Sequence, residues 1–179
     1  MSYLDRVFEN SSEVVVIPST QVIKFTEGSL KIGEASVAGE SAVKLKEVLF
    51  TEEGAGVYTG SITLPAGSRI IDIGVEAMAL WDAVTSASMV VGDADDPDGF
   101  FAATDVKATD LLVGETNNIE HPGGKAGAYI ASEQRVLYSA TARVITGTIT
   151  SVGAGTAGRT RMYVCYATPV TTAASFVAA

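Results

Sequence analysis

Apolar and polar residues alternate along several short stretches of this chain with a period of two. The longest regular stretch runs from Arg69 to Trp81. Every second position of this stretch is apolar, at Ile71, Ile73, Val75, Ala77, Ala79 and Trp81. The positions between them are first polar, at Asp72 and Glu76, and then apolar, at Met78 and Leu80. This pattern predicts a β-strand with one apolar face. Its second face is expected to be exposed to solvent at the start of the strand and covered by other residues at its end.

Shorter stretches of alternating, β-branched or aromatic residues predict further strands. They are residues 13–18, 22–25, 30–32, 42–50, 57–64, 87–91, 100–104, 134–150 and 161–167. In the stretch 134–150 the apolar positions change phase between Val144 and Ile145, which indicates a bulge or a sheet corner. Residues 105–125 are rich in turn signals and are expected to be mostly loop. Helical spacing is scarce and is found only over residues 2–9.

Strands of this length, separated by glycine, proline and Asx turns, are typical of an all-β fold. We predict an antiparallel β-sandwich, jelly-roll-like, with an N-terminal extension. The sandwich is expected over residues 56–169. Residues 1–55 form the N-terminal arm, whose own short strands either complete the sandwich or reach a neighbour, and residues 170–179 form a C-terminal tail.

Composition narrows the possible roles of this fold. The 179 residues are 47% hydrophobic and 18% charged, enough for one domain with a good core, or a domain with an arm. The formal net charge is −9, and no basic face is evident, which argues against nucleic-acid binding. No run of apolar residues is long enough to cross a membrane or to act as a signal peptide. We expect no membrane partner and synthesis in a cytoplasm.

The residues that usually carry chemistry are few. His121 is the single histidine and stands in a turn sequence, and Cys165, the single cysteine, is expected to be a small buried residue of the last strand. One histidine and one cysteine cannot form a zinc site or an intrachain disulfide. The glycine-rich residues 153–158 lack the lysine of a phosphate-binding loop, and Arg159 and Arg161 are expected to be surface cations. We therefore predict no enzyme activity, catalytic residue, cofactor or metal ligand.

One acidic stretch, VVGDADDPDGFF at residues 90–101, resembles a calcium loop at first sight. Its four carboxylates are Asp93, Asp95, Asp96 and Asp98. With Gly99 at the glycine position of an EF-hand, Ala94 falls on the first ligand position, and Asp105 replaces the usual final glutamate. The flanking segments also have the pattern of strands instead of helices, so the EF-hand interpretation fails.

A tight turn explains the same residues better. Asp96, Pro97 and Gly99 occupy the first, second and fourth positions that a type I turn prefers. Pro97 fixes its φ angle, and Gly99 is free to adopt a positive φ. We expect DDPDG to connect two strands and to present solvated carboxylates at a loop tip. Whether this tip faces solvent, a neighbouring subunit or an ion stays open.

The C-terminal two-thirds of the chain resembles a recurrent type of small structural protein of tailed phages. The resemblance covers about residues 57–167 and rests on GSITLPAGSRIIDIGVEAMALW, MVVGDADDPDGFFAATD and RVLYSATARVITGTITSVGAGTAGRTRMYVCYA. It implies a β-sandwich virion component, and among these a capsid decoration (cement) protein. Such proteins lie on the outer capsid surface, often as trimers, and tie capsid subunits together. The implied partners are the major capsid protein and further copies of the chain in a homotrimer.

The residues themselves are compatible with that role. A cement protein needs no chemistry, and strands of the arm could pair with the sheet edge of a partner. Phe8, Phe25, Phe50 and Phe176 are either anchors for such contacts or simply core residues. The negative charge would suit a basic patch on a capsid.

Two other functions remain open at this stage. A tail or head-fibre component with carbohydrate-binding loops would be favoured if Trp81, Tyr58 and the acidic residues 93–98 met at one end of the fold. A calcium-dependent carbohydrate-active enzyme would require two carboxylates facing each other across a cleft.

Overall fold

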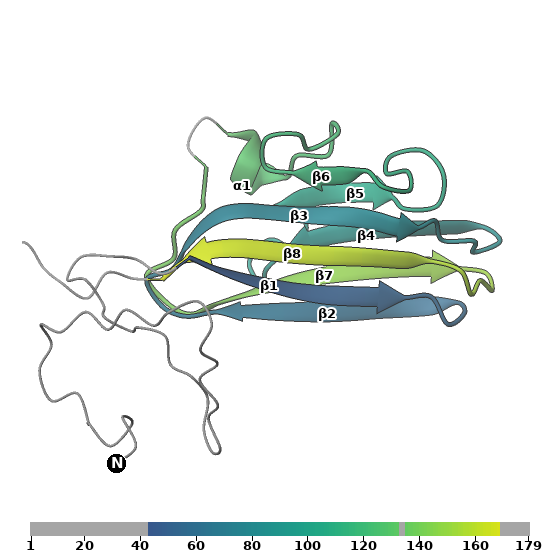
Figure 1. The fold of residues 1–179 in the computed structure, drawn as a ribbon, viewed down its shortest axis with the longest axis horizontal. Coiled ribbons are helices and arrows are strands. Elements are labelled where there is room, and N and C mark those ends of the chain that lie inside the picture. Colours follow the sequence, from purple (N-terminus) through teal and green to yellow (C-terminus); the bar gives the residue numbers. More distant parts are fainter. Residues whose placement is uncertain (1–42, 133–134, 169–179) are drawn as a thin grey trace, which may run out of the picture. The chain divides into compact units, whose positions relative to one another are not determined.

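The computed structural model describes residues 43–132 and 135–168 (Figure 1). The elements of this part of the chain are β1 (Val43–Thr51), β2 (Gly56–Leu64), β3 (Arg69–Ala79), β4 (Ser86–Gly92), β5 (Phe101–Asp105), β6 (Thr116–Asn118), α1 (Ala128–Ala131), β7 (Arg143–Val152) and β8 (Arg159–Ala167). The predictions for residues 2–9, 13–18, 22–25, 30–32 and 170–179, and the anchors Phe8, Phe25 and Phe176, lie outside the described residues.

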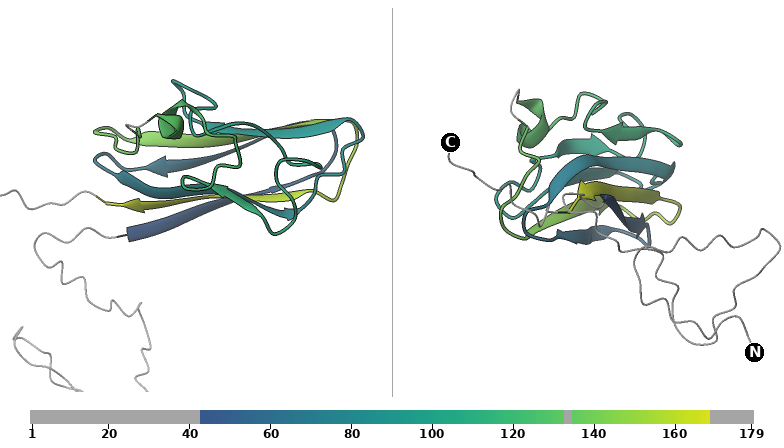
Figure 2. Two further views of the ribbon diagram at one scale, coloured as in Figure 1. Left: turned by 90° about the horizontal axis from the view of Figure 1, so that it is seen from above. Right: turned by 60° about the vertical axis from the view of Figure 1, so that its left-hand side comes forward.

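The strands form two four-stranded antiparallel sheets that pack face to face (Figure 2). The first sheet has the strand order β1-β8-β3-β6, and the second has the order β2-β7-β4-β5. The predicted all-β sandwich is therefore confirmed. The strands predicted at 57–64, 87–91, 100–104 and 161–167 correspond to β2, β4, β5 and β8.

The strand predicted over residues 42–50 completes the sandwich. As β1 it pairs with β8 over its whole length, from Val43 opposite Ala167 to Thr51 opposite Arg159. The predicted division between residues 55 and 56 therefore does not coincide with the edge of the sandwich. The turn residues after β1 connect one sheet to the other instead of separating two domains.

The core lies between the two sheets and follows the period of two. β8 turns Met162, Val164 and Tyr166 inward, and β7 turns Ile145 and Ile149 toward them. Gly147 lies between the two isoleucines, where a Cβ atom would be 2.8 Å from Met89 Cε and 2.9 Å from Met162 Sδ. A glycine at this position lets the two sheets pack closely.

β3 departs from the alternation that its sequence shows. Its pairing with β8 shifts between Ile70 and Asp72, so that Ile70 is buried (1% exposed) and Ile71 is 49% exposed. A second shift between Ala77 and Ala79 leaves Met78 44% exposed. The prediction that Ile71 shares the apolar face is wrong, because a bulge moves one residue to the other face. Met78 lies on the second face, as predicted, but the prediction that this end of the face is covered is wrong.

The strand predicted over residues 134–150 begins only at Arg143. Residues 135–142 instead form an irregular segment along the start of β3, where Ile70 N donates to Leu137 O (2.8 Å) and Ser139 N to Ser68 O (3.2 Å). The phase change at Val144 and Ile145 marks the start of β7, where Val144 points outward and Ile145 inward. Residues 105–125 are mostly loop, as predicted, and also contain the short strand β6.

Candidate functional site

The acidic stretch forms the connection between β4 and β5, and it contains the predicted turn. Gly99 N donates to Asp96 O over 3.1 Å, which closes the turn around Pro97 and Asp98. Asp93 Oδ1 accepts hydrogen bonds from Asp95 N and Asp96 N, both at 3.1 Å. The first carboxylate therefore organises the loop from within.

Gly99 is required for a different reason from the one predicted. It does not have a positive φ. A Cβ atom at this position would lie 2.3 Å from the ring of Tyr129, so the glycine is needed for close packing. Tyr129 belongs to α1, and its ring also meets Phe100 edge-on, with centroids 5.2 Å apart.

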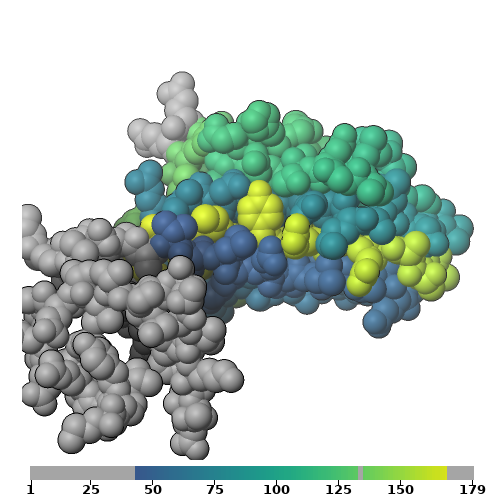
Figure 3. Space-filling model, in the orientation of Figure 1, coloured from purple at the N-terminus to yellow at the C-terminus, as the bar shows by residue number. Residues whose placement is uncertain are grey.

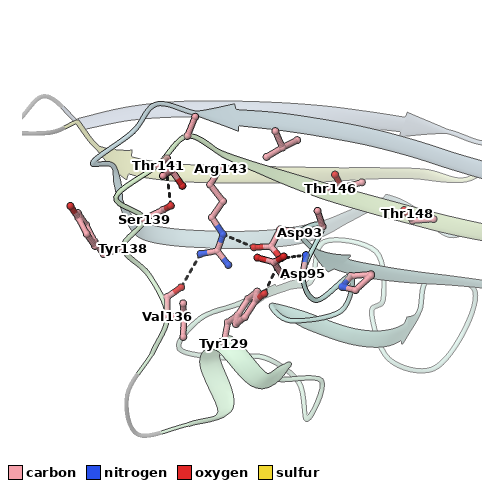
Figure 4. A pocket seen from close by; sticks show the side chains of 14 residues that line it. Asp93, Asp95, Tyr129, Val136, Tyr138, Ser139, Thr141, Arg143, Thr146 and Thr148 are labelled. Atoms are coloured by element: carbon pink, nitrogen blue, oxygen red, sulfur yellow. Dashed lines mark hydrogen bonds and ion pairs between the residues drawn. The ribbon is translucent and has the colours of Figure 1, made fainter.

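Asp93 lies at the centre of a compact polar cluster (Figure 4). Its Oδ2 accepts a hydrogen bond from Arg143 Nε at 2.7 Å, and its Oδ1 accepts one from the Tyr129 hydroxyl at 2.8 Å. The side chains of Asp93 and Arg143 are only 11% and 10% exposed. The guanidinium of Arg143 stacks on Tyr129 and Phe100, and its NH1 donates to Val136 O at 3.1 Å. The prediction of a solvated carboxylate is therefore wrong for Asp93.

The electrostatics of the cluster favour a charged Asp93 and a neutral Tyr129. Burial alone would raise the pKa of Asp93, but hydrogen bonds from Tyr129 and from Asp96 N, together with the charge of Arg143, hold that pKa below its ordinary value. Burial and the neighbouring carboxylate of Asp93 raise the pKa of Tyr129 to about 12. Asp93 and Arg143 therefore form an ion pair, and the neutral Tyr129 hydroxyl donates to the same carboxylate. This arrangement is suited to fixing the conformation of the acidic loop.

The cluster lies beside a surface groove, which we call the β7 groove. Its volume is about 790 Å³. The acidic loop lines it with Asp93, Ala94, Asp95 and Pro97, the irregular segment with residues between Val136 and Ala142, and β7 with Arg143, Val144, Thr146 and Thr148. Because Ile145 and Ile149 point into the core, Val144, Thr146 and Thr148 lie on the outer face of the second sheet. Arg143 begins β7 on the other face, and its side chain turns toward Asp93 (Figure 4).

The other three carboxylates of the acidic loop differ from Asp93. Asp95 and Asp98 are exposed and Asp96 is half-buried. Asp98 is the main cause of a raised pKa of Asp96, because two neighbouring carboxylates disfavour each other's charge. In the part of the chain that the structure describes, no group of three or more His, Cys, Asp or Glu side chains is arranged to hold a metal ion.

A fully buried carboxylate lies at the opposite end of the sandwich, and no local sequence pattern marks it. Glu52 follows β1 and is 2% exposed. Its Oε2 accepts hydrogen bonds from Asp82 N and Gly158 N, both at 3.0 Å, and its Oε1 lies 3.3 Å from the Ser151 hydroxyl. A Cβ atom at Gly155 would lie 2.2 Å from Oε1. A side chain at Gly155 would therefore collide with the buried Glu52, which explains one of the glycines in residues 153–158.

Trp81 and Tyr58 also lie at this second end. The two rings meet edge-on with centroids 4.9 Å apart, and Trp81 is buried, with its Nε1 donating to Thr160 Oγ1 at 2.9 Å. Trp81 follows β3, whereas the acidic loop follows β4, and these strands end at opposite ends of the sandwich (Figure 1). The condition that would favour a carbohydrate-binding fibre tip is therefore not met by these residues.

The remaining candidate residues that the structure describes make no hydrogen bond to Asp93 or Glu52. His121 is exposed in its turn, as predicted. Cys165 is half-buried on the outer face of the first sheet, where it was expected to be buried, because β8 turns Met162, Val164 and Tyr166 inward instead. Arg161 shares this outer face and forms an ion pair with Glu76. Figure 3 shows the strip of β8 side chains between β1 and β3. Nothing in this arrangement assembles a nucleophile with a base.

Among the described residues, no helix has the length and apolar character needed to span a membrane. Phe50, one of the four proposed anchors, is a core residue with 4% exposure.

Fold and site together define a two-sheet antiparallel β-sandwich with an ordered surface groove. Its structure is similar to a chain of a solved structure described as the acidic stable capsid of Helicobacter pylori bacteriophage KHP30. The TM-score is 0.51 at 19% sequence identity, and the match covers 72% of this chain and 90% of the phage chain. This likeness supports the assignment of the fold.

Two further solved structures resemble the chain more distantly. A chain of the cyanophage Pam1 capsid asymmetric unit gives a TM-score of 0.46 at 20% identity, covering 86% of this chain and 100% of its own length. A chain of the capsid of Ralstonia phage GP4 gives 0.44 at 17% identity, covering 75% and 88%. No family model and no curated protein matches the sequence.

Proposed function

We propose that this protein is a structural component of a bacteriophage virion, and specifically a decoration (cement) protein on the outer surface of the capsid. The proposal rests chiefly on the likeness to the chain in the KHP30 capsid structure, which extends over 90% of that chain. The resemblance of residues 57–167 to small tailed-phage structural proteins supports it independently. In this role the protein would be made in the cytoplasm of the host and would bind the major capsid protein.

The sandwich has the physical properties that a cement protein needs. Its two ends are tied by hydrogen-bonded carboxylates, Asp93 at one end and Glu52 at the other, which hold loops from distant parts of the chain together. A rigid body of this kind transmits load between capsid subunits without rearranging. The role requires no catalytic chemistry.

The copy number of the protein in a purified phage particle tests this proposal. Quantitative mass spectrometry, with the major capsid protein as internal reference, should find it in hundreds of copies, because a decoration protein repeats over the whole shell. A count of about a dozen or fewer would instead assign it to a tail or a single vertex, since those parts have low rotational symmetry.

We further propose that the protein is a homotrimer, as the resemblance implies. Light scattering after size-exclusion chromatography should give three times the 18.5 kDa mass of the chain. A mass that stays at one chain in dilute solution, with no affinity for capsids, would contradict both proposals.

A further inference from the structure

We propose that the β7 groove binds an extended segment of another protein, in which a lysine or arginine stands beside apolar side chains. Recognition depends on the chemistry of this segment and not on which protein carries it.

The walls of the groove are held in place before any partner arrives. Arg143 and Tyr129 fix the acidic loop through Asp93, as described above. The opposite wall is pinned by backbone hydrogen bonds, including Val136 N to Tyr129 O at 2.9 Å and Gly67 N to Ser139 O at 2.9 Å. A groove that is already ordered loses little conformational entropy on binding, which favours affinity.

The lining of the groove includes side chains that expose apolar surface to solvent. Val136, Tyr138 and Val144 are 45%, 60% and 45% exposed, and all three line the groove. Exposed apolar side chains that gather in one hollow are typical of an interaction site, and tyrosine is enriched at protein interfaces. A partner must therefore bring apolar side chains to cover them.

The carboxylates of the acidic loop indicate which charge the partner carries. Asp95 lines the groove, and Asp98 is exposed in the same loop. Arg143 does not offset them, because it is paired with Asp93. Arg69 and Arg135 line a separate hollow of about 580 Å³ that shares Tyr138 with the groove. A cation on the partner would therefore bind beside Asp95, with the exposed Asp98 of the same loop adding to the attraction.

The test uses the full chain and two short fluorescent peptides. In the first peptide lysine alternates with valine, and in the second glutamate replaces the lysine. Fluorescence anisotropy should show binding of the lysine peptide alone, weakened by added salt. The double variant Asp95→Asn/Asp98→Asn should weaken binding about tenfold, and so should Tyr138→Ser.

Matched controls separate the groove from general charge attraction. The double variant Glu47→Gln/Glu53→Gln removes the same amount of charge at exposed positions outside the groove. Val84→Ser removes an apolar side chain that is 75% exposed and also lies outside it. Both should bind the lysine peptide as the parent does, and circular dichroism should show that every variant is folded.

Several outcomes would overturn the inference. They are no binding of the lysine peptide, equal binding of both peptides, or equal weakening by the groove and control variants. Binding of glycans that Tyr138→Ser abolishes, without peptide binding, would make the groove a carbohydrate site. Self-association that the groove variants abolish, without peptide binding, would make it a contact between copies. Failure to find the protein on capsids would leave the peptide result unaffected.

Discussion

Asp93 shows how one side chain can organise a loop that otherwise looks like a cation site. Its carboxylate accepts hydrogen bonds from two backbone N–H groups, from Tyr129 and from Arg143, so each oxygen is occupied. The neighbouring Asp95 and Asp98 stay exposed. Asp93 therefore holds the loop in place, Asp96 is half-buried, and only Asp95 and Asp98 are exposed to a partner.

We expect Arg143→Met to destabilise the protein by about 3 kcal/mol, because it leaves Asp93 shielded from water without a counter-charge. The free energy of unfolding from urea titration measures this loss. Arg135→Met is the matched control, since the ion pair of Arg135 with Glu120 is largely exposed, with 38% and 68% side-chain exposure, and should contribute less than about 1 kcal/mol. Equal losses in the two variants would contradict a special role for Arg143.

At the scale of single elements, β3 illustrates how pairing overrides alternation. Its bulge at Ile71 brings Ile70 into the core, where the period of two predicts the reverse. The irregular segment 135–142 packs along the same end of β3 through backbone hydrogen bonds. This end of β3 is therefore shaped by its neighbours, and the segment it supports becomes a wall of the β7 groove.

Two neighbouring isoleucines test this register directly. Ile70→Ala should cost about 2–4 kcal/mol, because it opens a cavity in the core, whereas Ile71→Ala should cost less than about 1 kcal/mol. Urea titration of the two variants under identical conditions makes the comparison. A larger loss for Ile71→Ala than for Ile70→Ala would mean that Ile71 faces the core, and it would contradict the bulge.

At the scale of the whole molecule, hydrogen-bonded carboxylates recur in the connections between strands. Asp82 accepts hydrogen bonds from Ala157 N and Thr156 N in the loop between β7 and β8, and these bonds lower its pKa. The side chain of Lys125 forms a hydrogen-bonded ion pair with Asp110 and lowers the pKa of that carboxyl group. Several loops of this acidic protein therefore depend on carboxylates that must stay ionised.

The stability of the protein should consequently fall in acid. A carboxyl group with a lowered pKa in the folded state contributes stability above its unfolded pKa and loses it as the pH drops through the folded value. We expect the free energy of unfolding to be steady near neutral pH and to decline below about pH 4. Urea titrations at a fixed protein concentration and decreasing pH measure this dependence.

Asp93→Asn provides the control for the acid response. It should lower stability at neutral pH, and its stability should fall less steeply in acid, because one of the responsible groups is gone. An acid dependence identical to that of the parent would show that Asp93 does not contribute to it.

The sequence by itself determined the class of fold and most of its strands. Alternation is a local property, and it survives folding wherever a strand pairs regularly, as in β2 and β8. The turn around Pro97 was equally predictable, because aspartate, proline and glycine at these positions favour a type I turn. The reason for Gly99 was not predictable, because the ring of Tyr129 that excludes a side chain there comes from a distant part of the chain.

Only the tertiary structure decided which side chains meet. Arg143 stands 50 residues from Asp93, and the donors to Glu52 lie 30 to 106 residues away from it. No local pattern marks these partners, because the chain must close into two sheets before they come together. The β7 groove arises in the same way, from a loop, an irregular segment and a strand that are distant in sequence and adjacent only in the folded sandwich.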